Sequence, residues 1–241
     1  MGSIVSRLVL SAVILVLFSV RGNAQQVDVA IVLAADVSRS VDQEEFELQR
    51  RGYAQAITSR RFLEAVASGP RGAVALCFIE WAGAGQQAVI GHWTIIRDGE
   101  GAADLAKVLL EAPRSGMGRT AIGDALDFAV AEMEAAATTA ERHVIDVSGD
   151  GTSNSGRPVT AARDEAAAKG ITINGLAIVN EKTSGEFGGY LWAHTHPPGG
   201  LPNYYRENVV GGPGAFVVHV VNFSEFAGAM TNKLVTEVSM R

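Results

Sequence analysis

The stretch Val27–Ser40, VDVAIVLAADVSRS, decides the fold of this chain. Its first nine residues are almost continuously apolar, and a polar cluster follows them. Such a run is typical of a strand that is buried on both faces, as in the parallel sheet of an α/β protein. Ligands of open parallel sheets bind at the carboxyl ends of the strands. The polar residues that end this stretch are therefore the first candidates for a functional site.

Strands and helices alternate along the rest of the chain. Further strands are predicted at Gly72–Trp81, Ala88–Ile96, His143–Ser148, Ile171–Val179 and Phe216–Val221. Helices are predicted at Gln43–Thr58, Gly101–Ala112, Ala121–Ala137, Val159–Lys169 and Ser224–Met240, the last with Ser224 as its N-cap. The link Gly83–Gly85 is too short for a helical crossover, so its two strands form an antiparallel hairpin at a sheet edge. The pattern predicts a three-layer, doubly wound α/β domain with a mostly parallel sheet and one antiparallel edge strand.

The composition excludes two classes of protein. The 241 residues suit one sizeable domain, which we expect to cover residues 25–241. Hydrophobic residues make up 47% of the chain and charged residues 19%, which excludes a disordered chain. The single cysteine, Cys77, excludes a small module held by disulfides. Because Cys77 lies in an apolar run, we expect it to be a buried core residue.

The first 24 residues have the pattern of a secretory signal peptide. Arg7 precedes the 13-residue apolar stretch Leu8–Val20, and Gly22-Asn23-Ala24 forms a small–x–small cleavage pattern. A membrane span needs about 20 apolar residues, so we expect cleavage, no stable membrane anchor, and a periplasmic or secreted protein. Cleavage removes two arginines and no acid, which leaves 18 basic residues against 26 acidic ones, a net charge of −8. This acidic excess argues against nucleic acid or anionic membrane as the main partner.

Oxygen-bearing side chains follow three of the predicted elements. The first strand ends in a D-x-S-x-S turn that contains Asp36, Ser38 and Ser40. Thr120 lies in the loop before the long helix, and Asp150 follows the strand that begins at His143. Few charges among many oxygens suit a hard cation such as Mg²⁺ or Mn²⁺. The three loops contain no histidine or cysteine, the ligands that zinc favours.

These residues resemble the metal-ion-dependent adhesion site of von Willebrand factor A-type domains. More narrowly, the chain from Val27 onward resembles a bacterial family of exported proteins known as a von Willebrand-like domain of unknown function. The phrases that carry this resemblance are FIEWAG, GRTAIGDAL, RHVIDVSGDG, GITINGLAIVN and VVGGPGAFV. It implies that the cation, Mg²⁺ or otherwise Mn²⁺ or Ca²⁺, is bound by Asp36, Ser38, Ser40, Thr120 and Asp150. It also implies that the last coordination position takes an acidic side chain of a protein partner.

Other interpretations of the same residues remain open at this stage. Asp36 and Ser38 could cap the helix that begins at Gln43, and Asp150 could form a tight Asp-Gly turn. Asp146 suits a buried structural acid better than a ligand. Glu80 could support the metal site or cap an edge strand. The segments Gly116–Ala121 and Asp150–Gly156 loosely match a dinucleotide-binding loop and a calcium loop, but neither has the required context.

Residues 180–214 interrupt the alternation with prolines and glycines and show no clear periodicity. A connection of this length in a compact domain is usually functional or an ordered excursion. His194 and His196 could be half of a zinc site, but we expect two exposed, solvated histidines. The aromatic residues of this segment either line a binding surface near the metal or fix the segment in place; they are Tyr190, Trp192, Tyr204 and Tyr205.

Three functions remain compatible with the sequence. The first is an exported, cation-dependent protein-binding module, because the sequence contains no evident pair of nucleophile and base. The second is a metal-dependent hydrolase, which would need Glu80, Asp124 or a histidine of residues 180–214 as general base. The third is a structural scaffold with a vestigial metal loop.

Overall fold

One mixed sheet organises the computed structural model, which describes residues 25–179 and 188–240. The strands of this part of the chain lie in the spatial order β3-β2-β1-β4-β5-β6. Their bounds are β1 Gln25–Asp36, β2 Val74–Trp81, β3 Gln87–Ile96, β4 Thr138–Gly149, β5 Ile171–Ile178 and β6 Val217–Val220. Neighbouring strands are parallel except for β2 and β3, which are antiparallel. The predicted fold class and its antiparallel edge strand are confirmed.

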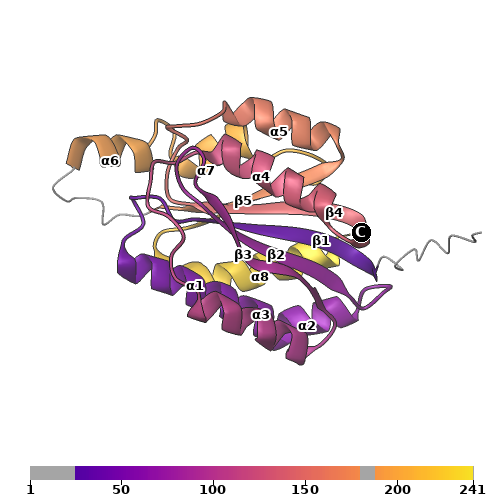
Figure 1. The fold of residues 1–241 in the computed structure, drawn as a ribbon. Coiled ribbons are helices and arrows are strands. Elements are labelled where there is room, and N and C mark those ends of the chain that lie inside the picture. The colour runs from indigo at the N-terminus through magenta and orange to yellow at the C-terminus, as the bar shows by residue number, and fades with distance from the viewer. Residues whose placement is uncertain (1–24, 180–187, 241) are drawn as a thin grey trace, which may run out of the picture.

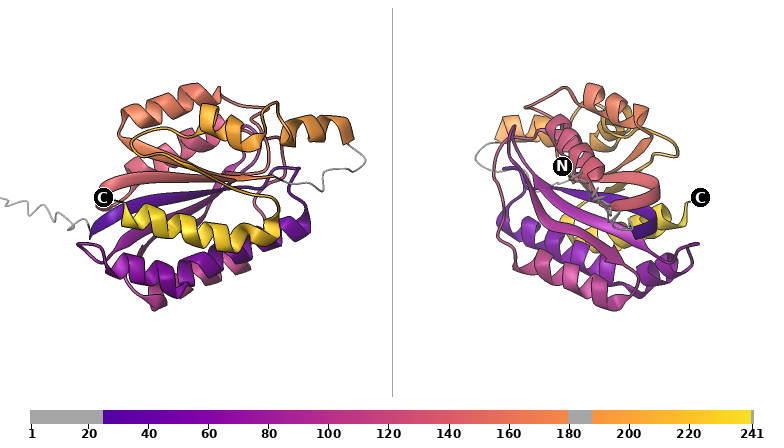
Figure 2. Two further views of the ribbon diagram at one scale, coloured as in Figure 1. Left: turned by 180° about the vertical axis from the view of Figure 1, so that it is seen from behind. Right: turned by 45° about the vertical axis from the view of Figure 1, so that its right-hand side comes forward.

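Helices cover both faces of the sheet (Figures 1 and 2). One face is covered by α1 (Gln43–Thr58), α2 (Arg60–Ala67), α3 (Gly99–Glu111) and α8 (Phe226–Ser239). The other face is covered by α4 (Ile122–Ala135), α5 (Val159–Ala168), the short α7 (Leu201–Tyr204) and the π-helical turn Tyr205–Val209. A further short helix, α6 (Gly188–Thr195), projects beside the loops at the carboxyl ends of the strands.

The central strand β1 contributes side chains to a separate hydrophobic core on each face of the sheet. Val29, Ile31 and Leu33 pack with α1, α3 and α8, whereas the alternate residues Val32 and Ala34 pack with α4 and α5. Every residue from Val27 to Val37 other than Asp28 has an exposed fraction of at most 1%, which explains why its sequence is almost continuously apolar. Cys77 on the adjacent strand is buried as expected.

Several local predictions were wrong or incomplete. Helix α2 was not predicted, although Ser59 caps it and its buried residues Phe62 and Val66 follow helical spacing. Ser224 is not the N-cap of the last helix, because a 3₁₀ turn precedes α8 and the helix begins at Phe226 without a side-chain cap. The segment expected to lack periodicity contains α6 and α7. The predicted signal peptide, residues 1–24, lies outside the described residues.

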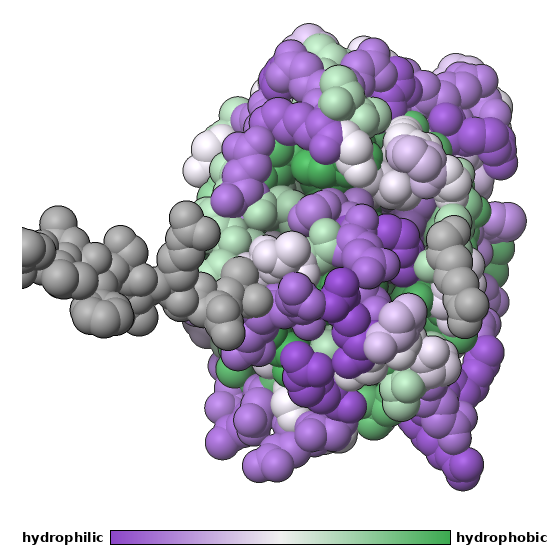
Figure 3. Space-filling view, turned by 90° about the vertical axis from the view of Figure 1, so that its right-hand side faces the viewer, coloured by the Kyte–Doolittle hydropathy of each residue, from purple (hydrophilic) through white to green (hydrophobic). Residues whose placement is uncertain are grey.

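The end of the sheet where the strands begin has a surface on which hydrophilic residues predominate, with smaller hydrophobic patches between them (Figure 3). Within residues 25–179 and 188–240, no helix combines the length and apolar character needed to cross a bilayer.

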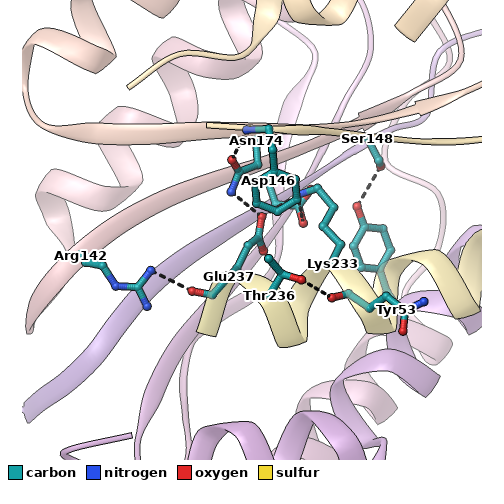
Figure 4. A network of polar contacts seen from close by, with 10 residues as sticks. Tyr53, Arg142, Asp146, Ser148, Asn174, Lys233, Thr236 and Glu237 are labelled. Carbon is teal, nitrogen blue, oxygen red and sulfur yellow. Dashed lines mark hydrogen bonds and ion pairs between the residues drawn. The ribbon is translucent and has the colours of Figure 1, made fainter. Parts of the chain in front are cut away.

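A buried ionic cluster attaches α8 to the sheet (Figure 4). Lys233 Nζ lies 2.7 Å from Asp146 Oδ2 and 2.6 Å from Glu237 Oε1, and all three side chains are fully buried. Asn174 Nδ2 donates a hydrogen bond of 2.8 Å to the same Glu237 oxygen. Burial raises the pKa of Asp146 to about 7, while Lys233 acts in the opposite direction. Asp146 is therefore a structural acid, as the sequence indicated.

Replacing Lys233 by Met tests the contribution of this cluster. The variant leaves two carboxylates buried without their cation, so we expect the free energy of unfolding to fall by about 3–5 kcal/mol in urea titrations. Arg60→Met is the matched control, because it breaks an exposed pair with Glu64 and should cost less than about 1 kcal/mol. Equal effects of the two substitutions would contradict the structural role of Lys233.

Candidate metal centre

The candidate site lies where the strand order reverses. The chain runs from β1 to its neighbour β2 on one side, whereas β4 adds on the other side of β1. Asp36 ends β1, and Ser148 near the end of β4 is in register with Ala35. The loops that leave these two strands must therefore diverge to opposite sides, which opens a crevice at this edge.

The structure brings all five predicted side chains together. Ser40 Oγ donates a hydrogen bond of 2.6 Å to Asp150 Oδ1. Ser38 Oγ lies 3.2 Å from Ser40 Oγ and accepts a 3.3 Å hydrogen bond from Thr120 Oγ1. The backbone N–H of Ser38 donates to Asp36 Oδ1 at 2.7 Å. Residues from three loops thus form one continuous set of oxygen atoms.

Each aspartate of this set has one buried oxygen without a hydrogen-bond partner. Both carboxyl groups are fully buried, yet Asp36 Oδ2 and Asp150 Oδ2 receive no hydrogen bond. The alternative that Asp36 and Ser38 cap α1 is wrong, because Asp42 is the N-cap and forms a capping box with Glu45. Unpartnered buried carboxylate oxygens are costly unless a cation or a proton neutralises them.

The pKa values of both aspartates show that cost. Burial raises the pKa of Asp36 to about 7, although hydrogen bonds from Ser38 and the nearby Arg114 act in the opposite direction. Burial also raises the pKa of Asp150 well above its ordinary value, and the charge of Asp36 adds to the increase. In the absence of a cation, the pair therefore binds protons at a pH where exposed aspartates are ionised.

The residues present fit a hard cation. Two carboxylates and three hydroxyls are the oxygen donors that Mg²⁺, Mn²⁺ and Ca²⁺ prefer, and the two orphaned oxygens need a positive charge. No group of three or more His, Cys, Asp or Glu side chains in the described residues is arranged to hold a metal ion. A cation here would thus depend on the hydroxyls of Ser38, Ser40 and Thr120 as well as on the carboxylates.

Arg114 and Glu80 hold two of the three loops in place, namely the first loop, which follows β1, and the second loop, which precedes α4. Arg114 Nη2 donates to the backbone carbonyls of Val37, Ser38 and Val41 at 2.8, 2.8 and 2.9 Å. Glu80 is fully buried and accepts hydrogen bonds from the Arg50 guanidinium at 2.7 Å and from the Ser115 backbone N–H at 2.8 Å. Glu80 therefore holds the second loop in place through Ser115. The expectation that it caps an edge strand is wrong, because β2 lies between β3 and β1.

His194 lies against the predicted ligands, which the sequence analysis did not expect. Only 7% of it is exposed, so the expectation of two exposed histidines was wrong for this one. Its Nε2 lies 3.0 Å from Thr120 Oγ1, and its Nδ1 lies 3.0 Å from Thr152 Oγ1. Burial lowers the pKa of His194 to about 4, so the imidazole is neutral at physiological pH. The three loops lack histidine, as the sequence showed, but α6 brings one to them.

Two of the four aromatic residues of the same segment have one of the two predicted roles in the structure, that of fixing the segment in place. Tyr205 is fully buried in the core beneath the site, and the Tyr204 hydroxyl accepts a 3.1 Å hydrogen bond from the Ser153 backbone N–H. These two residues fix the segment in place. Trp192 is 47% exposed and stacks on His196 with ring centroids 3.7 Å apart. The side chain of Tyr190 lies outside the described residues.

Comparison of the sequence with known families supplies a decisive observation. The profile of a family described as a protein of unknown function (DUF1194) matches residues 26–241. The chain belongs to this family. No curated protein is significantly similar in sequence to this DUF1194 member.

Solved structures show that the DUF1194 chain has a von Willebrand factor A-like fold. Proximal thread matrix protein 1 from the mussel byssus superposes with a TM-score of 0.62 at 16% identity, over 90% of this chain and 49% of that one. Another structure of the mussel protein, described as having a zinc-occupied MIDAS motif, gives a TM-score of 0.58 at 19% identity over the same shares. The chain thus spans about half the length of the mussel protein.

A domain of a bacterial pilus protein shows the same fold over nearly the whole length of that domain. The von Willebrand factor domain of the type V pilus tip protein Mfa5 from Porphyromonas gingivalis superposes with a TM-score of 0.56 at 11% identity. The match covers 88% of this chain and 95% of that one. At such low identities, these likenesses establish the fold.

The raised pKa of Asp36 predicts how the stability of the metal-free protein depends on pH. A folded-state pKa of about 7, against an ordinary value of 3.8, means that protonation stabilises the folded state. That contribution is complete below about pH 4 and is lost as the pH rises through 7. We therefore expect the free energy of unfolding of the wild type, measured by urea titration in chelator, to fall as the pH rises from 5 to 8. The free energy of unfolding of Asp36→Asn should fall less over the same range. Identical pH profiles would refute the burial argument.

Proposed function

We propose that this chain is an exported, divalent-cation-dependent protein-binding module. The observation that supports it is the pair of buried, unpartnered oxygens on Asp36 and Asp150, surrounded by the hydroxyls of Ser38, Ser40 and Thr120. The cation would neutralise both carboxylates and, as in the family resemblance, use a remaining coordination position for an acidic side chain of the partner. The predicted signal peptide, residues 1–24, would deliver the module to the periplasm or the exterior.

The surroundings of the site favour an acidic protein partner. Arg39 and Arg119 are exposed on the first and second loops, next to the proposed ligands Ser38, Ser40 and Thr120. Met117 of the second loop is 63% exposed, and Trp192 of α6 is 47% exposed. Exposed arginine, methionine and tryptophan side chains are enriched where proteins bind one another. The two arginines would attract a carboxylate toward the site.

The proximal thread matrix protein and the pilus proteins give this proposal a context. One structure of the mussel protein is described as having a zinc-occupied MIDAS motif. Another similar structure, the pilus adhesin SpaC from Lactobacillus rhamnosus GG, has a TM-score of 0.61 at 14% identity, over 90% of this chain and 31% of that one. Cation binding and adhesion therefore occur on this architecture, and the donor set described above is what would carry them here.

Calorimetric titration tests cation binding directly. We expect the purified chain to bind Mg²⁺, Mn²⁺ or Ca²⁺ and Asp36→Ala to lose that binding, because one of two charged ligands is removed. Asp104→Ala is the matched control, since it removes an exposed carboxylate from α3, and should bind as the wild type does. Absence of uptake at millimolar cation would refute the proposal and favour a scaffold with a vestigial metal loop.

Affinity capture from the exported fraction tests partner binding. We expect a partner to be retained in the presence of the cation and released by chelator. Asp36→Ala should fail to retain it, whereas Asp104→Ala should retain it. Retention of the partner in the presence of chelator and by Asp36→Ala would exclude a cation-dependent contact.

The hydrolase alternative has one residue in its favour. Glu80 is buried in an ion pair with Arg50, and Asp124 Oδ1 accepts a 2.6 Å hydrogen bond from the Arg157 backbone N–H; within the described residues, neither carboxylate is hydrogen-bonded to any of the five proposed ligands. His194 lies beside Thr120, but its pKa of about 4 makes it a weak base at neutral pH. Cation-dependent hydrolysis of model esters or phosphoesters that disappears in His194→Ala at a cation concentration that saturates the variant would establish this alternative.

A further inference from the structure

His194 is held against the second and third loops, which carry the proposed ligands Thr120 and Asp150, by contacts on both of its ring nitrogens and on its backbone. Nε2 contacts Thr120 Oγ1 of the second loop, and Nδ1 contacts Thr152 Oγ1 of the third loop, each at 3.0 Å. The Thr152 backbone N–H donates to the His194 carbonyl at 3.1 Å. The end of α6 therefore connects the second loop with the third through one imidazole.

Gly151 makes room for this imidazole. A Cβ atom at position 151 would lie 2.2 Å from His194 Nε2, well inside any permitted contact. The residue after the predicted ligand Asp150 must therefore lack a side chain if His194 is to reach Thr120. This close approach provides a reason for glycine at position 151 that is independent of turn formation.

The surrounding hydrogen bonds favour one tautomer of the ring. The Thr120 backbone N–H donates to Asn154 Oδ1 at 2.9 Å, which fixes the orientation of the Asn154 amide. The Asn154 Nδ2 group then faces His194 Nδ1 at 3.5 Å, which favours the tautomer in which Nδ1 accepts and Nε2 carries the hydrogen. His194 Nε2–H thus donates to Thr120 Oγ1, whose own hydrogen goes to Ser38 Oγ. One lone pair of the Thr120 hydroxyl remains for another contact.

We propose that His194 is a positioning residue of the metal centre: it orients the Thr120 hydroxyl as a ligand and couples cation binding to docking of residues 192–204 on the loops. This inference rests on the proposed function, because it assigns His194 to the same cation site. Residues one step removed from a metal orient its ligands, and their loss typically weakens metal affinity by about 10- to 100-fold. Because coupling is reciprocal, the cation also stabilises the docked segment.

Cation titration of three variants tests the positioning role. We expect His194→Ala to bind Mn²⁺ and Mg²⁺ about 10- to 100-fold more weakly than the wild type. His194→Gln, which retains an amide N–H donor, should recover part of the affinity. His196→Ala is the matched control, because His196 stacks on Trp192 and contacts Thr195 rather than Thr120. Its affinity should equal that of the wild type.

Hydrogen–deuterium exchange measures the coupling without relying on activity. In the wild type, we expect Mn²⁺ to slow amide exchange in residues 192–204 relative to chelator. His194→Ala should abolish this cation-dependent protection. Gly151→Ala is a second variant. It changes neither His194 nor any proposed ligand, but its methyl group occupies the position of the imidazole ring. It should reproduce both the loss of affinity and the loss of protection.

The outcomes separate this inference from the proposed function. If the wild type binds no cation, both fail. If the wild type binds a cation through Asp36, but His194→Ala and Gly151→Ala bind it equally well and retain the protection, the positioning role alone is overturned. Weaker binding by His194→Ala without recovery in His194→Gln, together with unchanged exchange in residues 192–204, would also overturn it.

Discussion

Two carboxylates buried at adjacent strand ends are the constraint around which this edge of the molecule is organised. Asp36 and Asp150 lie where the loops from β1 and β4 separate, and the charge of Asp36 raises the cost of ionising Asp150. The hydroxyls of Ser38 and Ser40, the backbone N–H of Ser38 and the charge of Arg114 offset part of this cost. One oxygen of each carboxylate still has no hydrogen-bond partner. A role in cation binding accounts for these two oxygens, whereas a purely structural role does not.

Much of this arrangement follows from local sequence signals. The apolar run that ends at Asp36 has the composition of a strand buried on both faces, and the short link Gly83–Gly85 permits only an antiparallel hairpin. Once the strands are parallel and adjacent, residues at their carboxyl ends must meet, so the convergence of Ser38 and Ser40 with the two aspartates could be predicted. Thr120 follows α3 rather than a strand, and only the resemblance to the adhesion site implied that it joins them. The assignment of these residues as metal ligands stays a prediction.

His194 could not be predicted in the same way, because its contacts span distant parts of the chain. Its partner Thr120 is 74 positions away in sequence, and no periodic pattern connects α6 to the second loop. A histidine in a segment rich in glycine and proline has the composition of a solvated loop residue, and only tertiary packing buries it. The helix α2 was missed for a more local reason: it follows α1 directly, and Ser59 both ends one helix and caps the next.

The bonds made by Arg114 have a consequence for the thermodynamics of ion capture. A single guanidinium spans three carbonyls of the first loop, while Glu80 anchors the start of the second loop through Ser115. The chain has therefore already lost most of its local conformational entropy at this edge when folding is complete. An incoming ion would have to shed water, but it would order little of these two loops. The enthalpy and rate of its capture would thus reflect dehydration of the ion more than rearrangement of these two loops.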